Sequence, residues 1–249
     1  MSRRWPERLW IVRHGESAGN VARDAALKSG RAVIDIAQRD ADVPLSNVGE
    51  DQARSLGRWF ADLPDGERPT TCFVSPYRRA MQTAVLVARE GGVETEQPIA
   101  DERLREREFG VLDRLTKMGI EQRFPDQVEL RARIGKFYYR PPGGESWTDV
   151  ILRLRSFLDT LSLHYAEPGS RVLVVAHQVV VLCLRYLIEE LDEERILAID
   201  RQGDIANCGV TEYALDGDRL VLERYNFTTP LSVEGAPVTA EPDVPSGSR

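Results

Sequence analysis

Short apolar runs alternate with segments of helical periodicity along most of the 249-residue chain. The runs with the length and composition of strands are residues 9–12, 70–74 and 171–176. The segments with apolar side chains at helical spacing begin near Ser46, Ala80, Ser146 and Gln178. Because strands and helices alternate, the pattern predicts an α/β fold of three layers, α/β/α, with a largely parallel sheet covered on both faces.

Other segments depart from this alternation. Residues 18–43 form a long polar excursion without a clear period, and residues 93–96 predict a short strand. A turn at residues 216–218 separates two β-favouring runs and predicts a hairpin. The charged, irregular segment of about residues 101–144 is interpreted as an insertion over the carboxyl-terminal edge of the sheet.

The domain organisation follows from these segments. The chain has no internal repeat, and the insertion does not have the character of a second domain, so a single domain is predicted over residues 1–229. From residue 230 onward the chain is rich in Pro, Ser, Gly and Glu. This composition predicts a disordered tail over residues 230–249.

Composition and charge narrow the class of partner. The net charge of −7 argues against a nucleic-acid partner, although a few local arginines can still hold a small anion. No apolar run approaches the roughly 20 residues of a membrane span, and the first residues lack the apolar core of a signal peptide. Cys72, Cys183 and Cys208 have no metal-type spacing. We therefore expect free thiols and a cytoplasmic protein that does not bind a membrane.

Polar side chains follow three of the predicted strands directly. Arg13 and His14 come after the first strand, the motif Ser75-Pro76-Tyr77-Arg78-Arg79 after the second, and His177 after the third. Because the carboxyl ends of parallel strands share one edge of a sheet, these groups can converge on one crevice. Imidazole as nucleophile and guanidinium as clamp indicate phosphate chemistry.

The charges in such a crevice also favour a particular state of the histidine. Two unit charges about 4 Å apart interact by roughly 4 kcal/mol at an effective dielectric near 20, whereas a helix N-terminus contributes about 0.3–1 kcal/mol. The arginines should therefore dominate phosphate binding, and their field favours neutral His14, the form that attacks phosphorus. A proton donor for the leaving oxygen is available in the loop 104–110, which carries Glu106 and Glu108.

Taken in order, these motifs resemble the histidine phosphatase superfamily, the phosphoglycerate mutase-like proteins, over about residues 8–227. The matching segments are Arg13-His14-Gly15-Glu16-Ser17 with Asn20, Leu45-Ser46 to Ala53, Ser75 to Ala84, Leu104 to Gly110, Gly144-Glu145-Ser146, Val174 to His177, and Asn207. The resemblance implies the phosphoglycerate mutase-like fold. It also implies no metal and no cofactor.

The resemblance further implies a role for each matching residue. His14 would be the nucleophile that becomes phosphohistidine, and Arg13, Arg78 and His177 would hold the phosphoryl oxygens. Asn20 would donate to the same group. Glu106 would protonate the leaving oxygen and then activate water. The motif register selects Arg78 and leaves Arg79 facing solvent, and it prefers Glu106 to Glu108.

A closer local resemblance concerns substrate binding. The stretch 136–146, with His177-Gln178, resembles the fructose-2,6-bisphosphatase domain, in which Lys136 and Gln178 match sugar-phosphate contacts. Tyr139 and Asn207 are further candidate contacts, although packing is an alternative for Tyr139. Glu145 either contacts substrate or starts a helix. Two positions depart from that domain, since a tyrosine is replaced by Lys117 and an arginine by Leu182. Phosphoglycerate mutases also usually have Gly and a polar pair where this chain has residues 178–180.

The motifs are compatible with three functions. The favoured one is a metal-independent phosphatase that hydrolyses a small phosphomonoester, such as a sugar phosphate, through a phosphohistidine on His14. The first alternative is a phosphoglycerate mutase, and the second is a non-catalytic protein that binds a phosphorylated ligand. The expected partner is a small phosphorylated metabolite. The oligomeric state is open, with a homodimer among the alternatives.

Overall fold

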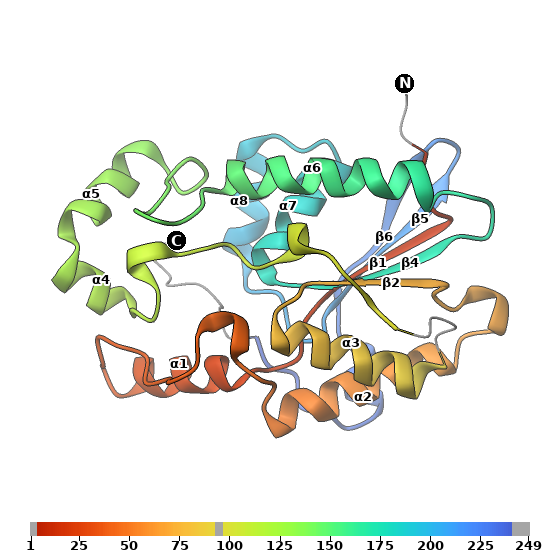
Figure 1. Cartoon of the computed structure of the whole chain (residues 1–249), viewed down its shortest axis with the longest axis horizontal. Coiled ribbons are helices and arrows are strands. Elements are labelled where there is room, and N and C mark those ends of the chain that lie inside the picture. The colour runs from red at the N-terminus through yellow and green to blue at the C-terminus, as the bar shows by residue number, and fades with distance from the viewer. Residues whose placement is uncertain (1–3, 93–96, 241–249) are drawn as a thin grey trace.

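A six-stranded sheet forms the centre of the computed structural model, which describes residues 4–92 and 97–240 (Figure 1). The strand order is β3-β2-β4-β1-β5-β6, in which β3, β2, β4 and β1 are parallel and β5 and β6 pair antiparallel. The strands are β1 (Arg8–Arg13), β2 (Thr71–Val74), β3 (Ile99–Ala100), β4 (Arg171–Ala176), β5 (Val210–Asp216) and β6 (Arg219–Phe227).

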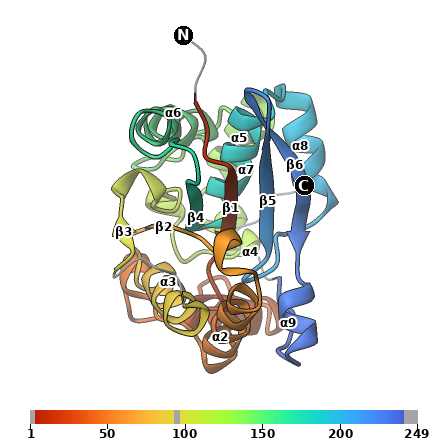
Figure 2. The ribbon, with the colours of Figure 1, turned by 90° about the vertical axis from the view of Figure 1, so that its right-hand side faces the viewer.

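Helices cover both faces of the sheet, as Figure 2 shows for α2 and α3 on one face and α6, α7 and α8 on the other. The helices are α1 (Ala18–Lys28), α2 (Asn47–Ala61), α3 (Arg78–Gly91), α4 (Lys117–Arg123), α5 (Pro125–Ile134), α6 (Trp147–His164), α7 (Gln178–Ile188), α8 (Glu193–Gln202) and α9 (Thr229–Val233). The three-layer α/β fold with a largely parallel sheet is thus confirmed.

Alternation along each strand explains why both faces carry a core. Leu9 and Ile11 of β1 pack into the core beneath α6 and α7, whereas Trp10 and Val12 pack into the core beneath α2 and α3. Successive strand side chains point to opposite faces, so a strand that is apolar throughout is stable only when both faces are covered. The near-continuous apolar runs of the sequence follow from this constraint.

Strand register brings the two histidines together. Arg13 of β1 pairs with Ala176 of β4, so the next residue of each chain segment, His14 or His177, emerges at the same edge. The backbone N–H of His14 donates to the carbonyl of Ala176 at 2.9 Å. Ser75, which follows β2, donates its N–H to Val175 at 3.0 Å. Three strand ends therefore meet at one edge.

The predicted insertion lies beyond this edge. In Figure 1, α4 and α5 occupy the end of the molecule toward which β1 runs. Phe109, Leu112, Leu115, Ile120 and Tyr139 form a small apolar cluster of their own there. Irregular charged sequence thus folds around a local core next to the strand ends, where it can shape a substrate site.

Two segments carry helices or turns that the sequence pattern did not indicate. The polar excursion contains α1, which is capped by Ser17, and a 3-10 turn η1 (Asp40–Asp42). The first part of the predicted tail carries α9, which buries Leu231 in the core beneath α2. The remainder of the tail, 241–249, and the predicted strand 93–96 lie outside the described residues.

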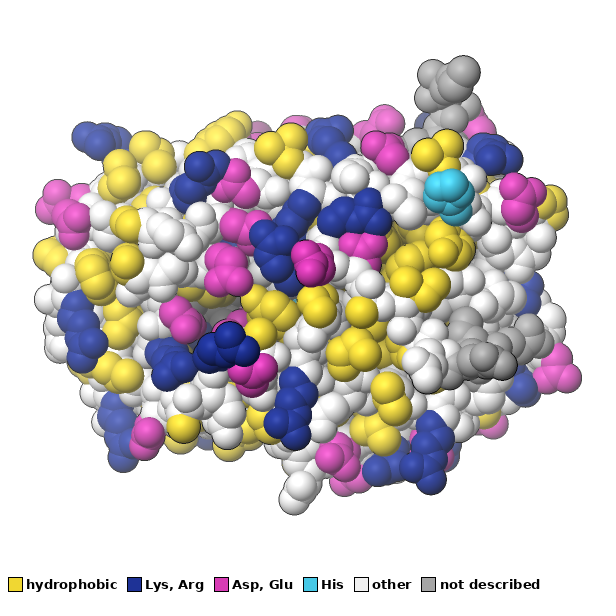
Figure 3. All heavy atoms as spheres, in the orientation of Figure 1, with side chains coloured by type: hydrophobic (Ala, Val, Ile, Leu, Met, Phe, Trp, Pro, Cys, Tyr) yellow, Lys and Arg dark blue, Asp and Glu magenta, His cyan; other side chains and the backbone are white. Residues whose placement is uncertain are grey.

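The surface carries charged side chains of both signs. On the face drawn in Figure 3, basic and acidic side chains are interspersed rather than separated into patches of one sign. Within residues 4–92 and 97–240, no helix combines the length and apolar character needed to span a membrane.

Candidate active site

His14 lies at the centre of the site with one ring nitrogen already committed. Its side chain is buried, and Nδ1 donates to the carbonyl of Gly15 at 2.7 Å, because a carbonyl oxygen can only accept. In the neutral ring this leaves the lone pair on Nε2. Arg79 Nε donates to that atom at 3.1 Å. The nitrogen available for attack therefore faces a guanidinium.

Arg79 rather than Arg78 supplies this guanidinium, which corrects the prediction from motif register. The Arg79 side chain is 3% exposed, whereas Arg78 is exposed. Helical spacing is the physical reason, since Arg79 lies one turn before Thr83 on the inner face of α3 and Arg78 lies 100° away. Thr83, on the same face, accepts a hydrogen bond from the N–H of Gly15 at 3.0 Å, so this face of α3 is the one turned toward His14.

His177 and Glu106 complete one wall of the site. His177 Nε2 lies 2.8 Å from the Ser75 hydroxyl, and its ring centroid is 5.1 Å from that of His14. Glu106 is 1% exposed, and its Oε2 lies 3.9 Å from His177 Nδ1. Its Oε1 accepts from the N–H of Arg107 at 2.7 Å. The structure thus places Glu106 next to His177, whose ring packs against that of His14.

Glu108 lies apart from this group. Its side chain is exposed and accepts a hydrogen bond from the Tyr77 hydroxyl at 3.0 Å. Burial, followed by the charge of Glu108, raises the pKa of Tyr77 far above its usual value, so the phenol stays protonated. The Tyr77 ring in turn packs against His177, with 5.2 Å between centroids. Glu108 therefore contacts Tyr77, and Tyr77 in turn packs against His177.

The remaining motif residues form hydrogen bonds with backbone groups. Arg13 is buried and donates to the carbonyl of Ile205. Asn20 forms a capping box with Ser17, accepting from its N–H at 2.9 Å. Asn207 Nδ2 donates to the carbonyl of His14 at 3.1 Å. Asn207 is thus placed on the backbone of the loop rather than on a substrate.

The whole arrangement has known relatives. Residues 9–228 match the family model of the histidine phosphatase superfamily, branch 1. The chain belongs to this superfamily. A 2,3-bisphosphoglycerate-dependent phosphoglycerate mutase of Methylobacterium sp. (strain 4-46) is 35% identical over 78% of this chain and 86% of that protein. A probable fructose-2,6-bisphosphatase of Schizosaccharomyces pombe is 31% identical over 76% of this chain and 40% of that protein.

A solved structure shows the same fold. The mycobacterial glucosyl-3-phosphoglycerate phosphatase in complex with VO3 superposes with a TM-score of 0.69 at 27% identity, over 89% of this chain and 99% of that chain. The histidine phosphatase fold is therefore shared along nearly the whole length of both proteins.

Glu145 has a structural role in this superfamily member. Its carboxylate accepts from Arg105 at 2.8 Å, from Arg153 at 3.1 Å and from the N–H of Glu108 at 3.1 Å. These contacts tie the loop that carries Glu106 to the start of α6. The structure favours this anchoring role over the predicted substrate contact, because three donors already occupy the carboxylate.

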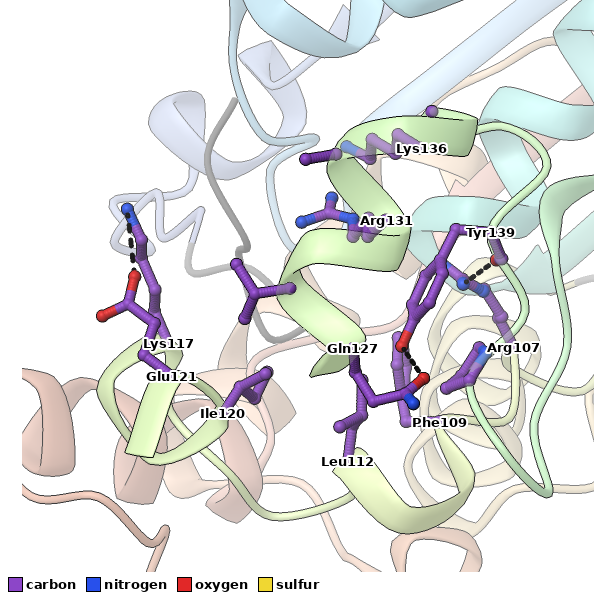
Figure 4. Close-up of a pocket in the computed structure, with 14 residues that line it drawn as sticks. Arg107, Phe109, Leu112, Lys117, Ile120, Glu121, Gln127, Arg131, Lys136 and Tyr139 are labelled. Atoms are coloured by element: carbon purple, nitrogen blue, oxygen red, sulfur yellow. Dashed lines mark hydrogen bonds and ion pairs between the residues drawn. The ribbon is translucent and has the colours of Figure 1, made fainter. Parts of the chain in front are cut away.

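A cavity of about 320 Å³ lies within the insertion, lined by residues of α4 and α5 and of the loops next to them (Figure 4). Arg107, the neighbour of Glu106, lines it, and so do the predicted substrate residues Lys136 and Tyr139. Lys136 pairs with Asp200, and the Tyr139 hydroxyl donates to Gln127 at 3.0 Å. Its other cationic lining residues are Lys117 and Arg131.

Burial lowers the pKa of three cationic side chains that line this cavity. Burial lowers the pKa of Arg107 to about 10, and it lowers the pKa of Lys136 against the opposing effect of Asp200. Burial also lowers the pKa of Arg131. Desolvated cations of this kind interact more strongly with an anion that enters the cavity than solvated ones do.

The described part of the predicted tail contacts two side chains that bind the backbone near His14. Gln52 accepts from the N–H of Glu16 at 2.8 Å and donates to the Thr239 hydroxyl at 2.9 Å. The Thr239 hydroxyl donates to Asn207 Oδ1 at 3.0 Å. Thr239 therefore joins the two amides that hold the loop around His14. No pattern in the sequence indicates this contact, because it depends on where the tail packs.

Replacing Thr239 by Val should weaken this support. The change removes a hydroxyl that both accepts and donates, which should lower the free energy of unfolding by about 1–3 kcal/mol. Thr239→Ser retains the hydroxyl and should remain close to the wild type. Urea denaturation of the three proteins measures the difference, and equal stability of the Val and Ser variants would contradict the contact.

Proposed function

We propose that this histidine phosphatase family member is a metal-independent phosphatase that hydrolyses a small phosphomonoester through a phosphohistidine on His14. The observation that carries the proposal is the commitment of His14 Nδ1 to Gly15, which leaves Nε2 facing Arg79 at 3.1 Å. Among the described residues there is no group of three or more His, Cys, Asp or Glu side chains that could hold a metal ion.

When substrate binds, a phosphoryl oxygen accepts the Arg79 Nε–H in place of His14 Nε2, which releases the Nε2 lone pair. Nε2 of neutral His14 then attacks phosphorus, and the bond from phosphorus to the ester oxygen breaks. The guanidinium of Arg79 and the ring of His177 lie where they can stabilise the phosphoryl oxygens, and Arg13 supplies a further positive charge. The Nδ1 hydrogen bond to Gly15 stabilises the imidazolium that forms when Nε2 carries the phosphoryl group.

Glu106 acts as the general acid in the first step and as the general base in the second. As a carboxylic acid it donates its proton to the leaving oxygen, which departs as an alcohol. As a carboxylate it then takes a proton from water while the water oxygen attacks phosphorus and the P–N bond breaks. Inorganic phosphate leaves, and His14 and Glu106 return to their starting states.

The cavity supports a substrate with a second anionic group, such as a sugar bisphosphate or a phosphorylated sugar acid. Arg107, Lys117, Arg131 and Lys136 contribute cations to it, of which Lys117 pairs with Glu121 of the same lining and Lys136 pairs with Asp200. Gln178, which follows His177 in the sequence, lies outside this lining and donates to Asp204 at 2.8 Å. The Gln178 amide oxygen is buried and has no protein partner among residues 4–92 and 97–240. A buried acceptor of this kind is usually satisfied by a ligand or water.

A phosphoglycerate mutase is the second candidate, favoured by the 35% identity to a protein of that name. A mutase shares the first step but returns the phosphoryl group to substrate instead of to water. Incubation with 3-phosphoglycerate and a bisphosphoglycerate primer separates the two. The proposal expects release of free phosphate, unaffected by EDTA, to exceed formation of 2-phosphoglycerate; faster formation of 2-phosphoglycerate would establish the mutase.

Glu106→Gln should lower turnover of an alkyl phosphate by roughly 10²- to 10⁴-fold, because the variant cannot protonate the leaving oxygen. p-Nitrophenyl phosphate should lose less, since its leaving group needs less protonation. Glu108→Gln is the matched control and should have a small effect. Steady-state kinetics on both esters test this, and a larger loss in the Glu108 variant would reverse the assignment.

Arg131→Ala should raise KM for a sugar bisphosphate by roughly 10- to 100-fold, the cost of losing a charged hydrogen bond to the second anion. The increase for p-nitrophenyl phosphate, which has one anionic group, should be much smaller. Arg133→Ala removes an exposed arginine of the same helix and serves as control. Equal increases for both substrates would contradict a second anion site in the cavity.

A further inference from the structure

One acidic residue holds the outer end of the Arg79 guanidinium. Nη1 of Arg79 donates to the backbone carbonyl of Asp40 at 2.6 Å and to Oδ1 at 3.0 Å, and Nη2 donates to Oδ2 at 3.2 Å. The Nε of the same group donates to His14 Nε2 at 3.1 Å. The guanidinium is therefore held between the excursion, which carries Asp40 in η1, and the nucleophile.

The two partners differ in burial. The side chain of Arg79 is 3% exposed and that of Asp40 is 44% exposed. A buried guanidinium is stable only with a counter-charge and with its donors satisfied. An arginine side chain also loses rotamer entropy when it is fixed, and this loss occurs before substrate arrives if a carboxylate already holds the planar group. Asp40 alone supplies the counter-charge, accepts hydrogen bonds from Nη1 and Nη2, and holds the guanidinium in one orientation.

We propose that Asp40 is a positioning residue that aims Arg79 at the phosphoryl group. The proposal rests on the proposed function only in placing that phosphoryl group on His14 Nε2. By binding Nη1 and Nη2 end-on, Asp40 turns the Nε edge of the guanidinium toward His14. A small cavity of about 50 Å³ is lined by Asp40, Arg79 and Asn20, so the excursion and the arginine share one cavity.

Two effects of Asp40 oppose each other. Its negative charge repels an incoming phosphate, whereas its hydrogen bonds align the cation that receives it. Half-exposed charges are screened by water, so the repulsion is small. Misplacement of a catalytic group by about 1 Å can cost roughly 10²-fold in rate. Alignment therefore outweighs repulsion, and removal of Asp40 should weaken the site rather than improve it.

The test compares Asp40→Ala and Asp40→Asn with Asp42→Ala, whose carboxylate lies on the same 3-10 turn and pairs with Arg39 at the surface. With p-nitrophenyl phosphate, Asp40→Ala should lower kcat/KM by about 10- to 100-fold, mainly in kcat, and Asp40→Asn should lose less. Asp42→Ala should stay within about twofold of the wild type. Thermal unfolding confirms that each variant is folded.

Coupling to Arg79 distinguishes positioning from a general effect on structure. In an Arg79→Lys background, Asp40→Ala should cost less than about threefold, because the planar group that it aims is gone. Losses that multiply in the double variant would overturn the proposal.

Calorimetric titration with inorganic phosphate separates this inference from the proposed function. Asp40→Ala should bind phosphate about tenfold more weakly, in an Arg79-dependent manner, whether or not the wild type turns over esters. A wild type that binds phosphate but releases none from esters would refute the phosphatase and leave the positioning role. An Asp40→Ala variant that binds phosphate as tightly as the wild type, or more tightly, would refute the positioning role.

Discussion

The hydrogen bond from His14 Nδ1 to the carbonyl of Gly15 determines what the rest of the site can do. It fixes the tautomer of the neutral ring and presents Nε2 to Arg79. Gly15 is itself immobilised, because its N–H donates to Thr83 and a Cβ at this position would lie 2.5 Å from the carbonyl oxygen of Gly49. The close approach of two glycines thus holds the carbonyl that orients the nucleophile.

The fold explains how distant residues reach this point. Parallel pairing of β1 with β4 places His14 beside His177, and β2 delivers Ser75 to the same edge. The insertion adds Glu106 through a loop that Glu145 anchors by three contacts. His14, His177 and Ser75 therefore come from strand ends and Arg79 comes from α3, while the insertion supplies both Glu106 and the lining of the cavity under α4 and α5.

Much of this architecture could be predicted from the sequence, because apolar runs and helical periods report burial directly. The strands other than β3, the layers, and the strand-end positions of His14 and His177 follow from such local patterns, whereas Glu106 was selected through the resemblance to the superfamily. Arg79 was missed because two adjacent arginines differ only in which side of α3 they occupy, a property set by the helix phase. Asp40 and Thr239 could not be predicted, since each acts through a partner far away in the chain.

A phosphoenzyme trapped during turnover tests the central claim most directly. Wild-type protein mixed with a phosphate ester, quenched under alkaline conditions and digested, should yield one phosphorylated peptide, with the phosphoryl group on His14. The modification should be lost in acid, as expected of a phosphoramidate, and absent from the His14→Ala variant. An acid-stable phosphoryl group, or one that remains in His14→Ala, would contradict the account.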